Sequence, residues 1–131
     1  QAEDAKRIRL TDETYVRGDV QLKKLMGRDM YESEVSDTKI GGDLQLEENK
    51  SAIDVLDNMI KGNLQVYKNE EMVNVLMNMV RGDLQVFDNN ALVNIENNKV
   101  KGNLQCKDNF PAPNVSGNMV YGDSEDQCAM Y

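Results

Sequence analysis

The sequence predicts an all-β fold, a β-solenoid of about five to six stacked coils. Three observations lead to this prediction. Glycine recurs every 20 residues, at Gly42, Gly62, Gly82, Gly102 and Gly122. A phrase that first reads Asn-Met-Ile-Lys-Gly-Asn-Leu-Gln-Val is repeated with few changes over residues 58–66, 78–86 and 98–106. Within each copy, apolar and polar residues alternate as they do in strands that bury one face.

Length and composition limit the function. The chain has 131 residues, the size of one domain, so residues 1–131 are expected to form a single solenoid domain. The net charge of −8 argues against a nucleic-acid partner, because cations hold such partners by their phosphates. No apolar run approaches the ~18 residues of a membrane-spanning helix. The chain has no His and no pattern typical of a catalytic or metal site, so we expect neither an enzyme nor a cofactor.

The N-terminal segment, residues 1–13, is highly charged. Its apolar side chains are confined to Ala2, Ala5, Ile8 and Leu10. The alternation at the last two fits a short strand of an incomplete first coil. A short amphipathic helix that caps the open end of the solenoid is the alternative.

The next segment, residues 14–37, is expected to be an irregular coil. Gly18 precedes Gly42 by 24 residues instead of 20, so this coil carries four additional residues. They fall somewhere between residues 23 and 38, and we expect them to form a bulged loop.

Residues 38–123 are expected to form regular coils. Alternation places Leu64 and Val66 on the buried face of one strand, and Val73 and Val75 on the buried face of another. The glycine that opens each repeat shares this inward parity, which predicts a crowded interior around it. The coil glycines are Gly18, Gly42, Gly62, Gly82, Gly102 and Gly122.

Two columns of asparagine mark corners of the coil. Asparagine tolerates a left-handed backbone, and stacked copies can pass amide hydrogen bonds from coil to coil. We therefore expect two structural ladders. One comprises Asn49, Asn69, Asn89 and Asn109, and the other comprises Asn58, Asn78, Asn98 and Asn118.

Two further polar columns point outward. The residue after each glycine alternates between Asp and Asn, and Asn63 in this column is expected to be a surface site of little energetic weight. The second column offers either a flat hydrogen-bonding face for polysaccharide or a polar ladder that stiffens the strands, and we favour the ladder. Its members are Gln21, Gln45, Gln65, Gln85 and Gln105, of which the last four form the candidate binding face.

A group of apolar residues gathers at one corner of the central coils. Its members are Leu56, Met59, Leu76, Met77 and Met79, hereafter the methionine patch. Polar residues hold the matching positions in the outer coils, so the patch predicts a self-association surface. The alternative is that some of these side chains turn inward at the corner.

The C-terminal coil departs from the repeat. Two prolines at 111 and 113 indicate a terminated edge, and residues 124–131, which lose the strand pattern, are expected to form a cap. Cys106 takes an inward position, and Cys128 follows it by about one coil. A disulfide between them would tie this tail to the end of the solenoid. The alternative is a buried Cys106 and a free Cys128.

The repeat Gly-Asn-Leu-Gln, together with the cysteine-bearing end from Cys106 to Cys128, resembles repeats of largely uncharacterised bacterial secreted proteins. The resemblance covers roughly residues 38 to 128. It implies a right-handed parallel β-helix and an extracellular, bacterial setting. It brings no activity and no catalytic residues.

These observations predict a secreted structural or self-assembling protein, such as a filament subunit or surface scaffold. The runner-up is an extracellular polysaccharide-binding or adhesin module that uses the outward Gln, Asn and Lys side chains. The expected partner is a further copy of the chain, in an oligomer or filament, or else a polysaccharide. The first residue, Gln1, fits removal of a secretory signal or a trimmed chain.

Overall fold

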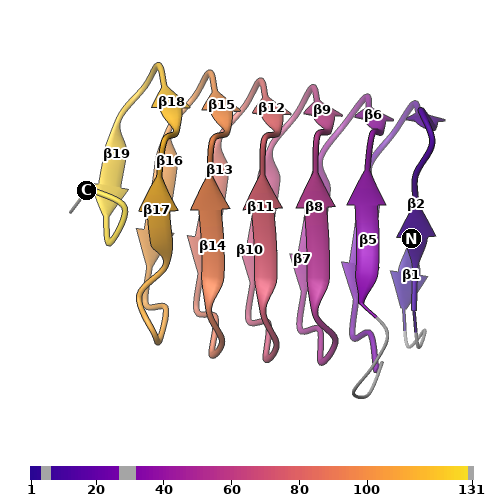
Figure 1. Ribbon diagram of the computed structural model, residues 1–131, viewed down its shortest axis with the longest axis horizontal. Helices are drawn as coiled ribbons and strands as arrows, with labels where there is room; N and C mark the ends of the chain where they lie inside the picture. The colour runs from indigo at the N-terminus through magenta and orange to yellow at the C-terminus, as the bar shows by residue number, and fades with distance from the viewer. Residues whose placement is uncertain (4–6, 27–31, 130–131) are drawn as a thin grey trace.

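The computed structural model describes residues 1–3, 7–26 and 32–129. Every regular element in these ranges is a β-strand, and the strands stack in three parallel sheets that wrap a solenoid of about six turns (Figure 1). In Figure 1 the front sheet runs upward, the chain returns behind it, and the coils advance toward the C-terminal end on the left. The solenoid is therefore right-handed, and the predicted fold class is confirmed.

The first sheet is the rear one in Figure 1 and has the strand order β1-β4-β7-β10-β13-β16-β19. Its strands are β1 (Ala2–Glu3), β4 (Val20–Lys23), β7 (Leu44–Glu47), β10 (Leu64–Tyr67), β13 (Leu84–Phe87), β16 (Leu104–Lys107) and β19 (Ser124–Asp126). From β7 onward, each residue pairs with the residue 20 positions later, as Leu64 does with Leu84. Like side chains therefore stack in columns along the solenoid axis.

The second sheet faces the viewer in Figure 1, and the third forms the short upper side. The second contains β2 (Arg9–Leu10), β5 (Ser33–Ser36), β8 (Ile53–Leu56), β11 (Val73–Leu76), β14 (Val93–Glu96) and β17 (Asn114–Ser116). The third contains β3 (Tyr15–Val16), β6 (Lys39–Ile40), β9 (Met59–Ile60), β12 (Met79–Val80), β15 (Lys99–Val100) and β18 (Met119–Val120). Each coil is thus a flattened triangle with three corners.

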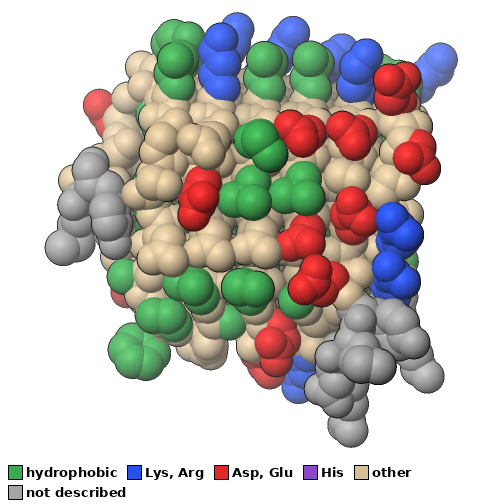
Figure 2. Space-filling model, viewed as in Figure 1, with side chains coloured by type: hydrophobic (Ala, Val, Ile, Leu, Met, Phe, Trp, Pro, Cys, Tyr) green, Lys and Arg blue, Asp and Glu red, His purple; other side chains and the backbone are tan. Residues whose placement is uncertain are grey.

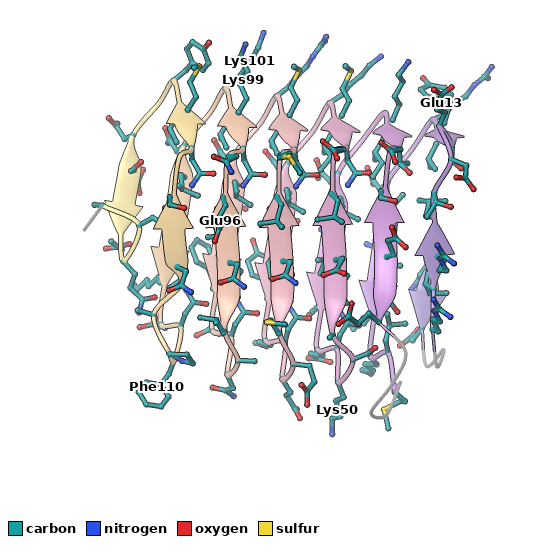
Figure 3. All side chains as sticks on the ribbon, in the orientation of Figure 1. Glu13, Lys50, Glu96, Lys99, Lys101 and Phe110 are labelled. Carbon is teal, nitrogen blue, oxygen red and sulfur yellow. A yellow bond between two sulfur atoms is a disulfide. The ribbon has the colours of Figure 1, made fainter. Side chains whose placement is uncertain are left out.

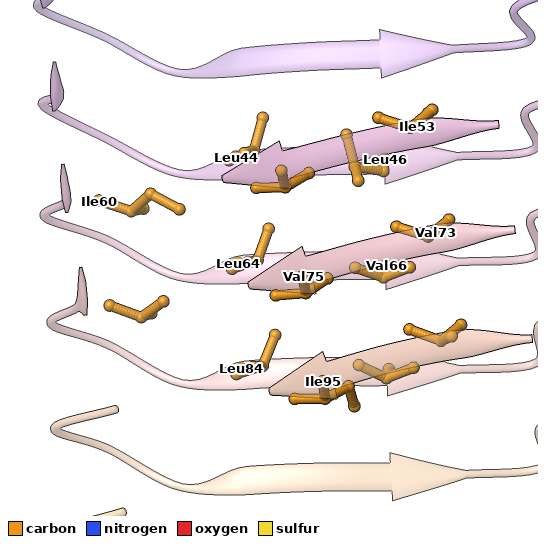
Figure 4. Packing of buried hydrophobic residues seen from close by; sticks show 14 of the residues in the cluster. Leu44, Leu46, Ile53, Ile60, Leu64, Val66, Val73, Val75, Leu84 and Ile95 are labelled. Carbon is orange, nitrogen blue, oxygen red and sulfur yellow. The ribbon is translucent and has the colours of Figure 1, made fainter. Parts of the chain in front are cut away.

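The core is a set of apolar columns inside this triangle. Leu44, Leu64 and Leu84 lie above one another, and Val73 and the other inward residues of the second sheet pack against them (Figure 4). All are fully buried, as alternation predicted. Because each coil repeats the shape of its neighbour, small β-branched and leucine side chains fill the narrow interior without aromatic residues.

The N-terminal residues form an incomplete first coil. Strand β1 pairs with β4, and β2 pairs with β5, which supports the strand alternative over the helix. The additional residues of the irregular coil lie between Leu25 and Ser33. Leu25 still holds the register, since its N–H donates to Asn49 Oδ1 at 3.0 Å, and Ser33 pairs with Ile53. Residues 27–31, where the bulged loop was predicted, lie outside the described residues.

Two expectations about the backbone are wrong. Residues 124–126 keep the repeat and form β19, because backbone pairing with β16 does not require apolar side chains at an end with no further coil. The glycines do not face the interior. They lie half-exposed at the third corner, where a Cβ on Gly82 would lie 2.8 Å from the carbonyl oxygen of Gly62. The crowding comes from the neighbouring coil along the axis.

Candidate functional site

Two buried asparagine ladders run along two corners of the solenoid, as predicted. In the second, Asn78 Nδ2 donates to the carbonyl oxygen of Val55 at 2.8 Å and to Asn98 Oδ1 at 3.0 Å. Asn78 Oδ1 accepts from the backbone N–H of Asn58 at 3.0 Å and from its Nδ2 at 2.9 Å. Each amide thus satisfies buried backbone groups in adjacent coils, which makes the ladders structural.

The first ladder repeats this geometry at the opposite end of the second sheet. Asn69 Nδ2 donates to the carbonyl oxygen of Leu46 and to Asn89 Oδ1, both at 3.0 Å. Asn69 Oδ1 accepts from the backbone N–H and Nδ2 of Asn49 at 3.2 and 2.9 Å. The two corners therefore have the same interior chemistry.

The ladders end differently, and the sequence did not reveal this. In the first ladder Gln127 takes the place of an asparagine: its Oε1 accepts from the backbone N–H and Nδ2 of Asn109 at 2.9 and 3.0 Å. The second ladder ends at the half-buried Asn118 and begins at Thr38, whose N–H donates to Asn58 Oδ1 at 3.0 Å. The signal for Gln127 was its position 18 residues after Asn109, near the ladder's period.

The left-handed backbone lies one residue before the asparagines. Asp57, Met77 and Asn97, which precede the second ladder, have φ values of 53°, 57° and 56°. The ladder asparagines of the described residues have negative φ. A turn one residue earlier lets the amide point inward while the preceding side chain points to solvent.

The column after the glycines is a third ladder, and the expectation for Asn63 is wrong. Its Oδ1 accepts the backbone N–H of Asp83 at 2.8 Å, and its own N–H donates to Asp43 Oδ1 at 2.7 Å. The side chains turn along the axis and lie over the glycines of the next coil. Because these residues are half-buried, the bonds contribute to stability.

The glutamine column forms the predicted ladder on the rear sheet. Gln45 Nε2 donates to Gln65 Oε1 at 2.6 Å, and Gln65 Nε2 donates to Gln85 Oε1 at 2.9 Å. The series ends on Glu125, which accepts from Gln105 at 3.1 Å. The amides already pair along the axis, which leaves this face less free to hydrogen-bond a polysaccharide.

The disulfide between Cys106 and Cys128 is present, with Cα atoms 5.2 Å apart. Both residues are buried and belong to the core cluster. A turn over residues 127–129 follows β19 and brings Cys128 back onto the core. The same turn places Gln127 against Asn109, so the bridge and the end of the first ladder form one unit.

The methionine patch lies on the outside of the solenoid. Met77 is 52% exposed, and Leu56, Met59, Leu76 and Met79 are half-buried and absent from the core. Figure 2 shows hydrophobic side chains gathered in the middle of the front face. The alternative in which these residues turn inward is therefore wrong. The corner is also hollowed, and Asp37, Asp57 and Lys39 of neighbouring coils border the methionines there.

Charged side chains lie around the patch and also within its own columns, where Asp57 stands one coil before Met77 and Glu96 pairs with Leu76. Acidic residues cover the N-terminal part of the front sheet, and cations form a row along the upper edge (Figure 2). The row, hereafter the cation column, comprises Lys61, Arg81 and Lys101 in successive coils, together with Arg17, which is separated from Lys61 by Gly41. These residues share a column because the strands of the third sheet stack in register. The acidic side is crowded: a side-chain hydrogen bond and repulsion from Asp54 raise the pKa of Glu32.

The described residues show no other site of recognisable chemistry. No three His, Cys, Asp or Glu side chains within them come together as metal ligands would. The same ranges contain no helix that could cross a membrane. Comparisons with family models, curated proteins and solved structures give no match to this chain.

Proposed function

We propose that this chain is a secreted structural protein that self-associates side by side through the methionine patch, as a subunit of a filament or surface scaffold. The ladders and the core keep each coil uniform along the axis. A uniform rod with an apolar strip on the side of its middle coils is suited to lateral assembly. The disulfide supports a compartment outside the reducing cytosol.

The observation that carries the proposal is Met77. It is the only apolar residue with a positive φ among the described residues, whereas the same corner has Asp57 in the coil before and Asn97 in the coil after. Asp and Asn are the residues that this backbone favours. A half-exposed methionine there reduces local backbone stability and exposes apolar surface, which an interface compensates.

Lateral contact is favoured over stacking along the axis. The turn that carries Cys128 lies over part of the C-terminal end, and two prolines precede the last strand of the front sheet. Proline lacks the N–H that a further strand would need. The methionine patch, by contrast, lies open on the side of the rod.

The test compares the native protein with Met77→Lys/Met79→Lys in light scattering after size exclusion, over a range of concentrations. Lysine fits both sites, since Lys68 has the same left-handed backbone and Lys99 occupies the column of Met79. The variant should remain folded and become monomeric.

The matched control is Asn90→Lys/Ala112→Lys, which adds the same charge at exposed sites away from the patch. It should assemble like the native protein. A native protein that is monomeric at every concentration, or a patch variant that assembles unchanged, would contradict the proposal.

A further inference from the structure

We propose that the solvent-facing side of the third sheet, hereafter the cationic side, binds an anionic lipid surface. Its lysines and arginines contact the lipid phosphates, and its methionines and tyrosines enter the boundary between headgroups and acyl chains. The inference adds a partner to the proposed scaffold, the surface on which it lies, and does not require self-association.

The strand register arranges the cationic side in two outward columns. The first residue of each strand of the third sheet forms one column, and the residue after each strand forms the other. Half of these positions hold cations and none holds an acid, in a chain with 23 acidic and 15 basic residues. The first column is Tyr15, Lys39, Met59, Met79, Lys99 and Met119, and the second is Arg17, Gly41, Lys61, Arg81, Lys101 and Tyr121.

The cations of this side have no acidic partner within the described part of the chain. Lys61, Arg81 and Lys101 are exposed, and every salt bridge between described residues lies on another side of the solenoid. Lys99 lies over the ring of Tyr121, with its Nζ 5.7 Å from the centroid. Figure 3 shows Lys99 and Lys101 projecting from the upper edge. Stacked coils place the successive cations of a column about 5 Å apart, where they repel one another, and an anionic surface relieves this repulsion.

Apolar side chains lie among these cations. Tyr15, Met119 and Tyr121 are 55%, 57% and 60% exposed, and Met59 and Met79 are half-buried between them. Figure 2 shows hydrophobic and cationic side chains next to one another along the upper edge. A soluble polyanion would pair with the cations and leave the apolar groups in water. A bilayer surface accommodates both, because anionic headgroups attract Lys and Arg while Tyr and other apolar groups are favoured at the boundary below them.

Carboxylates border the cationic side mainly along its N-terminal half. Three exposed acids stand two residues before the first column in the first three coils, at Glu13, Asp37 and Asp57. The same column continues with Met77, Asn97 and Gly117. On the other border, Oδ1 of Asp43 and Asp83 turns along the axis and accepts a backbone N–H of the next coil at 2.7 and 2.8 Å, which leaves Asp123 at the end of that ladder. The C-terminal half of the cationic side is therefore expected to lie closer to the lipid.

Vesicle cosedimentation tests the surface. The native protein should bind vesicles that contain phosphatidylglycerol and should not bind vesicles of phosphatidylcholine alone. Lys61→Gln/Lys101→Gln should lower the partition onto the anionic vesicles about thirtyfold, since each cation near such a surface contributes about fivefold. Lys50→Gln/Lys107→Gln makes the same charge change at exposed sites on other sides and should bind like the native protein. A native protein that does not bind the anionic vesicles, or equal losses in the two variants, would overturn the inference.

A tryptophan reporter tests the orientation. The chain has no Trp, so Tyr121→Trp gives a single reporter on the cationic side, and Phe110→Trp gives one at the first corner, where Phe110 is 81% exposed. On anionic vesicles the emission of Tyr121→Trp should shift to the blue and be quenched by brominated acyl chains, and that of Tyr15→Trp should shift less. Phe110→Trp should keep the emission of a residue in water. A shift at Phe110→Trp without one at Tyr121→Trp would overturn the inference.

Inorganic polyphosphate distinguishes a lipid surface from a soluble polyanion. If the protein binds polyphosphate through Lys61 and Lys101 while anionic vesicles leave the emission of Tyr121→Trp unchanged, the cations serve a soluble partner and the inference is overturned.

Met77→Asn separates this inference from the proposed function. Met77 lies outside the cationic side, so the variant should self-associate more weakly and still bind anionic vesicles like the native protein. A native protein that binds these vesicles but never associates contradicts only the proposed function. One that associates but does not bind them contradicts only this inference.

Discussion

The two asparagine corners of each coil are alike inside and different outside. Inside, Asn69 and Asn78 make the same four kinds of bond to the coils before and after. Outside, the first corner carries a pair between Lys50 and Glu70 at 3.8 Å in its middle coils and exposed Met26 and Phe110 in its outer coils, whereas the second carries Met77 and its apolar neighbours in the middle coils. The interior of a coil is therefore set by the demands of stacking, and its exterior is free to vary with function.

The largest expected effect tests the likeness of the interiors. Asn78→Ala and Asn69→Ala should each lower the free energy of unfolding by about 4 kcal/mol, because four buried backbone or amide groups each lose a partner. Denaturant unfolding measures both. If the losses of unfolding free energy in the two variants differ by more than a factor of two, the two corners do not have equivalent interiors. Asn63→Ala, in the half-buried third ladder, should cost about 1 kcal/mol.

The two asparagine ladders end differently at the C-terminal side, and removal of the disulfide should affect only the first of them. Cys106→Val/Cys128→Ala should lower the free energy of unfolding by about 3 kcal/mol, since the bridge closes a loop between residues 22 apart. Valine suits the first site because Val86 holds the same position one coil earlier. Hydrogen exchange should then speed up at Asn109, where Gln127 loses its anchor, and stay unchanged at Asn98. Equal acceleration at both corners would contradict the link between the bridge and the first ladder.

The third corner has no buried asparagine ladder and depends on glycine. Gly82→Ala should cost about 2 kcal/mol, because its Cβ would meet the backbone of the preceding coil. Gly18→Ala is the matched control, since no atom lies within 4 Å of its Cβ position. Thermal unfolding compares the two. A Gly82→Ala variant as stable as Gly18→Ala would mean that the coils are not closely stacked at this corner.

Much of the fold could be predicted from the sequence because the period is visible in it. A repeat of 20 residues with alternating apolar positions leaves one arrangement in which like residues stack, and both asparagine ladders follow from it. Two points were left open by the sequence: whether Cys106 and Cys128 form a disulfide, and whether the methionine patch faces solvent or the core. The second was open because alternation along a strand does not determine which way a side chain at a corner turns.

Other features were beyond the sequence for physical reasons. The glycines share the inward parity of the strands, yet a bend at the corner turns their Cβ direction along the axis. Gln127 lies in a tail without repeat character and follows Asn109 by 18 residues instead of 20, and the fold of the turn is what brings it to the ladder. The cation column, by contrast, follows from the same period, since Lys61, Arg81 and Lys101 recur every 20 residues, and the structure adds that all three are exposed.

The most direct measurement is the joint effect of Met77→Asn on stability and association. Asparagine relieves the left-handed backbone and removes apolar surface, while Asp57 and Asn97 show that the corner accepts such residues. The account predicts an unfolding free energy higher by about 0.5–1 kcal/mol and a weaker self-association in sedimentation equilibrium. A variant that is less stable than the native protein and still associates unchanged would contradict the account, in which the interior stabilises the fold and this exterior corner mediates self-association.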